Sequence, residues 1–174
     1  MSKKVLILLA HQNMEKSVAN KALINGVKDM SGVTIINLYE EKSHPFDNDK
    51  FKELLTKNDA VIFQFPFYWA SAPAILKKWT DEVFTGCAKK DFIAGKPLMV
   101  VTTTGSEYDA YRTGGRNMFT IDELIRPYQL IANHSGMKWV SPVVVYGLND
   151  LESPDTILRI KKGVEEYKNR ITTI

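Results

Sequence analysis

The chain has 174 residues, of which 44% are hydrophobic and 25% charged, and this length can bury a full core as one domain spanning 1–174. The formal net charge is only +3 and the basic residues are spread along the chain, which argues against a nucleic-acid partner. One cysteine, Cys87, excludes an internal disulfide and suits a reducing, cytoplasmic compartment. We expect Cys87 to be a small buried side chain.

The first apolar run, Val5–Ala10, follows two lysines and ends at a polar His-Gln-Asn stretch. It is shorter than the apolar part of a signal peptide and lacks a small-residue cleavage site. No segment approaches the roughly 18 apolar residues of a membrane span. The run is therefore predicted to be a buried strand.

Five apolar, β-branched runs alternate with stretches of helical periodicity. Several runs are continuously apolar, which indicates strands buried on both faces of a parallel sheet. The pattern predicts a flavodoxin-like, doubly wound α/β fold with strand order 2-1-3-4-5 and helices on both faces. The predicted strands are Val5–Ala10, Val33–Leu38, Ala60–Phe65, Leu98–Thr103 and Trp139–Tyr146; helices are predicted over Val18–Met30, Ala74–Phe84 and Pro154–Arg170.

Pro142 lies inside the fifth strand run. Proline removes a ladder hydrogen bond and is tolerated mainly on edge strands or at bulges. Its position agrees with the predicted order, in which the fifth strand is an edge.

The loop after the first strand has neither GxGxxG nor GxxxxGK[ST], which argues against a standard dinucleotide or P-loop site. It ends with Ser17 just before a helix, so Ser17 is predicted at or near the N-cap. The free N–H groups of Val18, Ala19 and Asn20 then form an anion site, to which His11 can also donate. The alternative is that Ser17 only caps a helix and His11 only ends a strand.

The loop after the third strand contains Pro66, Phe67, Tyr68 and Trp69 in a row, and Pro73 then opens a helix with Ser71 as a candidate cap. Aromatic side chains beside free backbone groups suit the wall of a site for a flat ring. The alternative is that Phe67 and Trp69 only cover the core.

The loop after the fourth strand begins with Thr103, Thr104, Gly105 and Ser106, whose small size lets a ligand approach backbone amides. About 14 residues then pass before a capping-box pattern at Thr120–Glu123, and connections of this length are usually functional. Together, the three loops suit a ligand with a flat ring and a phosphate, such as flavin mononucleotide (FMN). No metal site is expected.

The stretch "FQFPFYWASAPAILKKWTDEVF" resembles the Q-x-P-x-x-W…P-x-x-L-K-x-W-x-D-x-V-F signature of the flavodoxin-like NAD(P)H:quinone oxidoreductases. This family includes DT-diaphorase, ancillary flavoproteins of potassium-efflux systems and general stress flavoproteins. The "ILLAH", "TTTGS" and "GMKWVSPVVVYG" segments extend the resemblance over nearly the whole chain.

The resemblance implies noncovalently bound FMN, hydride transfer from NADH or NADPH to quinones, and a homodimer. It places His11 and Ser17 through Asn20 at the phosphate and ribityl chain, Pro66 through Trp69 against the ring, and Thr103 through Ser106 near its pyrimidine end. FAD, used by the animal enzymes, is disfavoured because the first loop is short.

Two features of the loop after the fourth strand bear on catalysis. Tyr111 matches a family tyrosine implicated in stabilising the reduced flavin, whereas Asn117 stands where the family's histidine is expected. Arg112 and Arg116 are candidates for binding the 2′-phosphate of NADPH, because a guanidinium binds phosphate through two donors at once. The alternative is that both arginines only solvate an exposed loop.

Two other functions are rivals to the oxidoreductase. A one-electron flavodoxin-type carrier is expected to be strongly acidic, which this chain is not. A regulatory flavoprotein that docks on a membrane transporter is compatible with the resemblance and does not exclude the enzyme.

Overall fold

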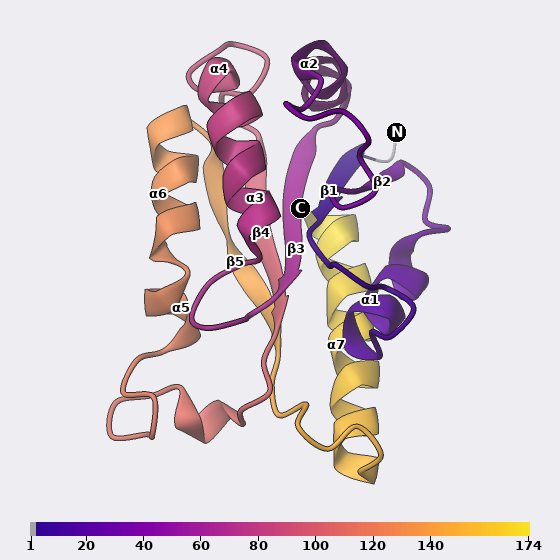
Figure 1. The fold of residues 1–174 in the computed structure, drawn as a ribbon, viewed down its shortest axis with the longest axis vertical. Coiled ribbons are helices and arrows are strands. Elements are labelled where there is room, and N and C mark those ends of the chain that lie inside the picture. Colours follow the sequence, from indigo (N-terminus) through magenta and orange to yellow (C-terminus); the bar gives the residue numbers. More distant parts are fainter. Residues whose placement is uncertain (1–2) are drawn as a thin grey trace.

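A computed structural model describes residues 3–174, which form a five-stranded, all-parallel sheet in the order β2-β1-β3-β4-β5 (Figure 1). The predicted order is confirmed, and every strand matches its predicted range to within a residue at each end. The strands are β1 (Val5–Leu9), β2 (Val33–Asn37), β3 (Ala60–Pro66), β4 (Pro97–Thr103) and β5 (Lys138–Val145).

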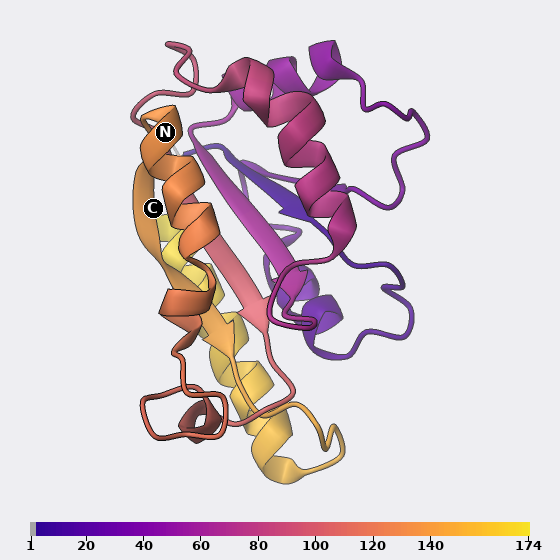
Figure 2. The same cartoon turned by 60° about the vertical axis from the view of Figure 1, so that its left-hand side comes forward.

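Helices cover both faces of the sheet (Figures 1 and 2). One core packs α1 and α7 against the sheet, and the other packs α2, α3 and α6 against the opposite face. The helices are α1 (Ala19–Val27), α2 (Asn48–Lys57), α3 (Ala74–Trp79), η1 (Thr80–Phe84), α4 (Thr85–Cys87), η2 (Tyr108–Ala110), α5 (Ile121–Leu124), α6 (Arg126–Ser135) and α7 (Pro154–Thr173). No helix within residues 3–174 is long and apolar enough to cross a bilayer.

The central strand β1 explains why its sequence is continuously apolar. Leu6 and Leu8 enter one core, whereas Val5 and Ile7 enter the other. Successive side chains of a strand point to opposite faces, so a strand covered on both sides needs apolar residues at every position.

The edge strand β5 contains an irregularity at the predicted proline. Met99 of β4 pairs with Val140 and Val101 pairs with Val143, so Ser141 and Pro142 together face a single residue of β4. Pro142 therefore lies at a bulge on an edge strand, where its missing N–H interrupts no regular ladder.

Two helix boundaries depend on local chemistry. The helix expected over Ala74–Phe84 changes at Thr80 into the π-helical η1, and Pro73, rather than Ser71, is its N-cap. The helical segment after the capping box is broken at Ile125, because α5 ends at Leu124 and α6 starts at Arg126 with a proline in its first turn. The capping box of Thr120 and Glu123 is also present.

Cys87 is buried at the end of α4, as expected. Burial raises the pKa of its thiol, which keeps the sulfur protonated and unreactive at neutral pH.

Candidate functional site

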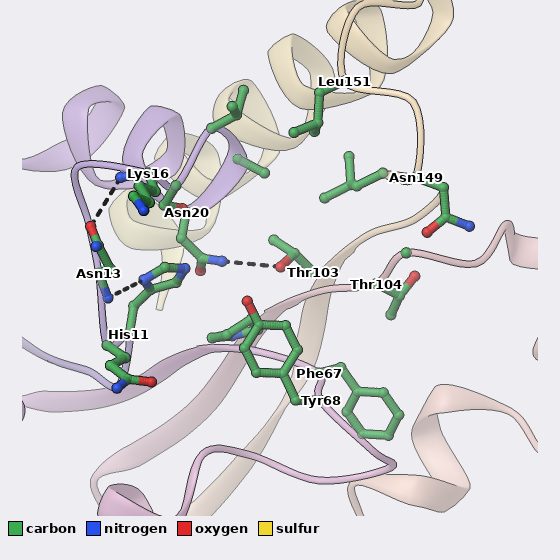
Figure 3. A pocket seen from close by; sticks show the side chains of 17 residues that line it. His11, Asn13, Lys16, Asn20, Phe67, Tyr68, Thr103, Thr104, Asn149 and Leu151 are labelled. Carbon is green, nitrogen blue, oxygen red and sulfur yellow. Dashed lines mark hydrogen bonds between the residues drawn. The ribbon is translucent and has the colours of Figure 1, made fainter.

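A cavity of about 530 Å³ opens where β1, β3 and β4 end (Figure 3). Parallel α/β sheets bind ligands beyond the carboxyl ends of their strands, near the point where the strand order reverses. All the predicted cofactor-binding residues except Trp69 and Ser106 line it: His11, Ser17, Val18, Ala19, Asn20, Pro66, Phe67, Tyr68, Thr103, Thr104 and Gly105.

The cavity also has walls that the sequence reasoning missed. Gln12, Asn13 and Lys16 come from the first loop, and Leu148, Asn149 and Leu151 come from the segment after β5. Because β5 ends at the same edge of the sheet, the carboxyl-end rule applied to all five strands would have found this segment. Gly105 makes room for it, since a Cβ there would lie 2.4 Å from Asn149 Oδ1.

The His11 ring is held in one tautomer. Its Nδ1 accepts a hydrogen bond from the Asn13 backbone N–H at 3.2 Å, so the proton of the neutral ring resides on Nε2 (Figure 3). Burial lowers the pKa of His11. The ring is therefore a neutral N–H donor at neutral pH.

This lowered pKa predicts a pH dependence of apoprotein stability. Below about pH 6.5, the ordinary pKa of histidine, the unfolded chain takes up a proton that the folded chain resists. The His11 contribution to stability is therefore present above this pH and falls as the pH decreases. We expect the melting temperature of the wild-type apoprotein to fall more than that of His11→Gln between pH 7.5 and 5.5. Parallel curves for the two proteins would contradict it.

The start of α1 presents several unpaired donors to the cavity. The N-cap is Val18, one residue later than Ser17, and it has no side-chain cap. Ser17 is 9% exposed, and its hydroxyl makes no hydrogen bond with another described residue, so the reading of Ser17 as a mere cap is not supported. The first N–H groups of α1 have no partner within the helix. With Lys16 beside them, these groups have the chemistry to bind an anion.

The floor of the cavity joins two strands to α1. Asn20 Nδ2 donates to Thr103 Oγ1 at 3.0 Å (Figure 3). The Phe67 backbone N–H donates to the Thr103 carbonyl at 2.9 Å. The aromatic loop is thereby attached to the end of β4 at the cavity edge.

The aromatic loop turns tightly at Trp69 and Ala70. The backbones of Tyr68 and Ser71 exchange two hydrogen bonds across this turn. Trp69 and Ala70 both have positive φ, 47° and 62° respectively. Such turns favour Asn and Gly, so these two residues are strained. Trp69 is fully exposed, at 101%, whereas Phe67 is buried. The core-covering alternative is therefore wrong for Trp69, whereas Phe67 belongs to the core and also lines the cavity.

The long loop after β4 extends past the end of the sheet (Figure 2). Tyr111 is buried there, with its ring 6.2 Å from Phe67 and 6.0 Å from Tyr146. Burial first, then Asp122 and neighbouring tyrosines, raise the pKa of Tyr146 to about 12. Tyr111 does not line the cavity, although its ring packs against that of Phe67, which does.

The other predicted residues of this loop also lie outside the cavity lining. Arg116 Nη2 donates to Ser106 Oγ at 2.6 Å, and Arg112 pairs with Asp109 at 3.5 Å. The Asn117 backbone N–H donates to the Ala110 carbonyl at 2.9 Å. These contacts fold the loop back on itself beside the cavity mouth.

The chain belongs to the family described as having a flavodoxin-like fold, whose profile matches residues 3–171. It is 40% identical over 169 residues to General stress protein 14 of Bacillus subtilis (strain 168), covering 94% of this chain and 96% of the relative. It is 36% identical over 169 residues to the glutathione-regulated potassium-efflux system ancillary protein KefG of Pectobacterium atrosepticum, covering 94% and 92%.

Two solved structures are similar throughout. An NADPH-quinone reductase from P. pentosaceus has a TM-score of 0.84 and 30% identity, covering 98% of this chain and 99% of the other. The general stress protein 14 of Treponema denticola, in complex with FMN, has a TM-score of 0.85 and 25% identity, covering 97% of both chains.

Proposed function

We propose that this protein is an FMN-dependent NAD(P)H:quinone oxidoreductase that transfers two electrons as hydride. The observation that carries the proposal is the cavity, which has an anion-binding helix start on one wall and aromatic residues on another. The related structures named as an NADPH-quinone reductase and as an FMN complex support it.

The residues present fit FMN. The phosphate is assigned to the start of α1, Ser17 and Lys16, because these supply free donors and a positive charge. The ring is assigned to Pro66 through Trp69 and to the small residues Thr103 through Ser106. A volume of about 530 Å³ is ordinary for a cofactor cavity, and FMN is preferred to FAD.

Bound FMN accepts and donates hydride, and the protein's part is to bind, orient and exclude water. His11, neutral with its proton on Nε2, donates to a ligand without adding charge. Tyr111 is proposed as a hydrogen-bond donor to the reduced flavin, and Asn117 takes the place of the family's histidine, although neither residue lines the cavity.

Colour is the first test. The purified protein is expected to be yellow and to release FMN, rather than FAD, on heating. The FMN-loaded protein is expected to oxidise NADH or NADPH with menadione as acceptor. A colourless preparation whose apoprotein does not take up added FMN would overturn the proposal.

The two arginines of the long loop are proposed to bind the 2′-phosphate of NADPH. Replacing Arg112 and Arg116 with alanine is expected to raise KM for NADPH about tenfold or more, because a charge-assisted contact contributes about 1.5–3 kcal/mol. KM for NADH should change little. Steady-state kinetics with both nucleotides tests this, and equal effects on the two would mean that the arginines do not read the phosphate.

A homodimer is the proposed assembly. An apolar groove of about 680 Å³ runs between α3–η1 and α6, and its rim carries Leu130, which is 67% exposed. The exposed Trp69 lies on the loop that leads into α3. A second copy covering this side would bury both residues and close the cavity mouth. Sedimentation at micromolar concentration should give a dimer, and a fully active monomer would contradict it.

Regulation of a transporter is the second candidate. The relative named as a potassium-efflux ancillary protein favours it, and it is compatible with oxidoreductase activity. Co-purification of the protein with membrane fractions would support it. A protein found wholly in the supernatant, with full quinone reductase activity, would favour the enzyme alone.

A further inference from the structure

Gln64 is a buried polar residue beneath the cavity to which the proposed mechanism gives no role. It lies in β3, is 0% exposed and does not line the cavity. Its Nε2 donates to the Asn20 carbonyl at 3.2 Å and to Asn20 Oδ1 at 3.3 Å. Its Oε1 is buried and accepts no hydrogen bond from any residue of 3–174. An amide in a core is costly, and an orphaned acceptor adds to the cost.

The contacts with Asn20 determine which way both side-chain amides face. A backbone carbonyl can only accept, so Gln64 must turn its nitrogen toward Asn20. That nitrogen would repel the Asn20 Nδ2 group, so the Asn20 atom facing it must be Oδ1. Asn20 Nδ2 is consequently directed to Thr103 Oγ1 at 3.0 Å.

The orientation of Asn20 in turn decides whether the Thr103 hydroxyl, on the cavity floor, donates or accepts. Of three consecutive threonines, Thr102 donates its hydroxyl to the Phe65 carbonyl and Thr104 to the Ser106 carbonyl. Thr103 instead accepts from Asn20, so its own proton is available to a ligand. If Asn20 were reversed, the Thr103 proton would bond to Asn20 Oδ1, and the hydroxyl would offer only lone pairs.

We infer that Gln64 is a positioning residue that makes the cavity floor a hydrogen-bond donor surface. It acts through Asn20 and Thr103 and selects a ligand portion rich in acceptors, such as the ribityl oxygens or ring carbonyls of a flavin. The identity of the ligand rests on the proposed function, whereas the orientation of Asn20 does not.

A double-mutant cycle tests the ligand part. FMN dissociation constants of apoproteins are measured by fluorescence for the wild type, Gln64→Met, Asn20→Ala and the double variant. We expect Gln64→Met to weaken binding about tenfold and the double variant to bind no more weakly than Asn20→Ala alone. Additive effects, or an unchanged constant for Gln64→Met, would overturn the inference.

Two further variants separate positioning from general damage. Tyr167→Phe removes another buried, unpartnered polar atom, in the core on the α1–α7 side, and should leave FMN binding unchanged. Gln64→Leu likewise removes the side-chain amide and serves if Gln64→Met does not fold. It cannot donate to Asn20, so it should weaken FMN binding similarly. Wild-type affinity in a folded Gln64→Leu variant would overturn the inference.

A readout on the apoprotein needs no flavin. In the wild type, NMR should show the Asn20 side-chain amide protected from hydrogen exchange, and Gln64→Met should remove this protection. Unchanged protection would overturn the positioning role even if FMN binds. If the wild type binds no FMN but Gln64→Met removes the protection, the proposed function and the ligand assignment fail, whereas the Gln64–Asn20 link holds.

Discussion

Replacing Ser17 with aspartate is expected to weaken FMN binding by about a hundredfold. Ser17 is buried immediately before α1, and its hydroxyl has no hydrogen bond to another described residue. A carboxylate there would face the flavin phosphate. At an effective dielectric constant of about 20, two charges about 5 Å apart repel by roughly 3 kcal/mol, which corresponds to about two orders of magnitude in affinity.

The same substitution should not harm folding, because a negative charge near a helix N-terminus interacts favourably with the helix dipole. Riboflavin provides the internal control because it lacks the phosphate, so its dissociation constant should change little. Asn48→Asp adds the same charge at the first residue of α2, away from the cavity lining, and should affect neither ligand. An equal loss of FMN and riboflavin affinity in Ser17→Asp would contradict the phosphate assignment.

The strands and their order were predictable because a strand buried on both faces has a continuously apolar sequence. Val5 through Leu8 alternate between the two cores, and each core requires an apolar side chain. The helix boundaries were less predictable. The change from α3 to the π-helical η1 at Thr80 leaves no periodic signal, because apolar residues such as Trp79 and Val83 suit either geometry.

The site was predictable where a general rule applied to the loops that were considered. The carboxyl-end rule selected the loops that contain Ser17, Phe67 and Thr103, and all three residues line one cavity. Asn149 was missed because the segment after β5 was not considered. Gln64 was missed as well, because a glutamine within an apolar strand shows its role only when its hydrogen-bond partners are known.

The aromatic residues around β3 and α3 show where sequence reasoning could not decide. Trp69 and Trp79 are ten positions apart in the same motif. Trp79 is 0% exposed, and its ring lies 5.6 to 5.9 Å from those of Phe51, Phe63 and Phe84, whereas Trp69 is fully exposed on a strained turn. The residue type alone does not distinguish an aromatic residue of the core from one that contacts a ligand or a partner.

Substitutions of these two tryptophans are expected to differ strongly in their effect on the free energy of unfolding. Trp79→Ala is expected to lower the free energy of unfolding of the apoprotein by about 3–5 kcal/mol, because it leaves a cavity among the surrounding rings. Urea denaturation at one fixed protein concentration measures this loss. A change below about 1 kcal/mol would mean that the core collapses readily around residue 79.

Trp69→Gly is the matched variant and should behave in the opposite way. Glycine adopts the φ of 47° without strain, so the free energy of unfolding should stay the same or rise by up to about 1 kcal/mol. FMN binding should nevertheless weaken, because the ring assigned to the flavin is absent. If Trp69→Gly destabilised the apoprotein as much as Trp79→Ala, the exposed position of Trp69 would be wrong. If Trp69→Gly bound FMN like the wild type, the Trp69 ring would not contact the flavin, and contact with a second copy would be its remaining proposed role.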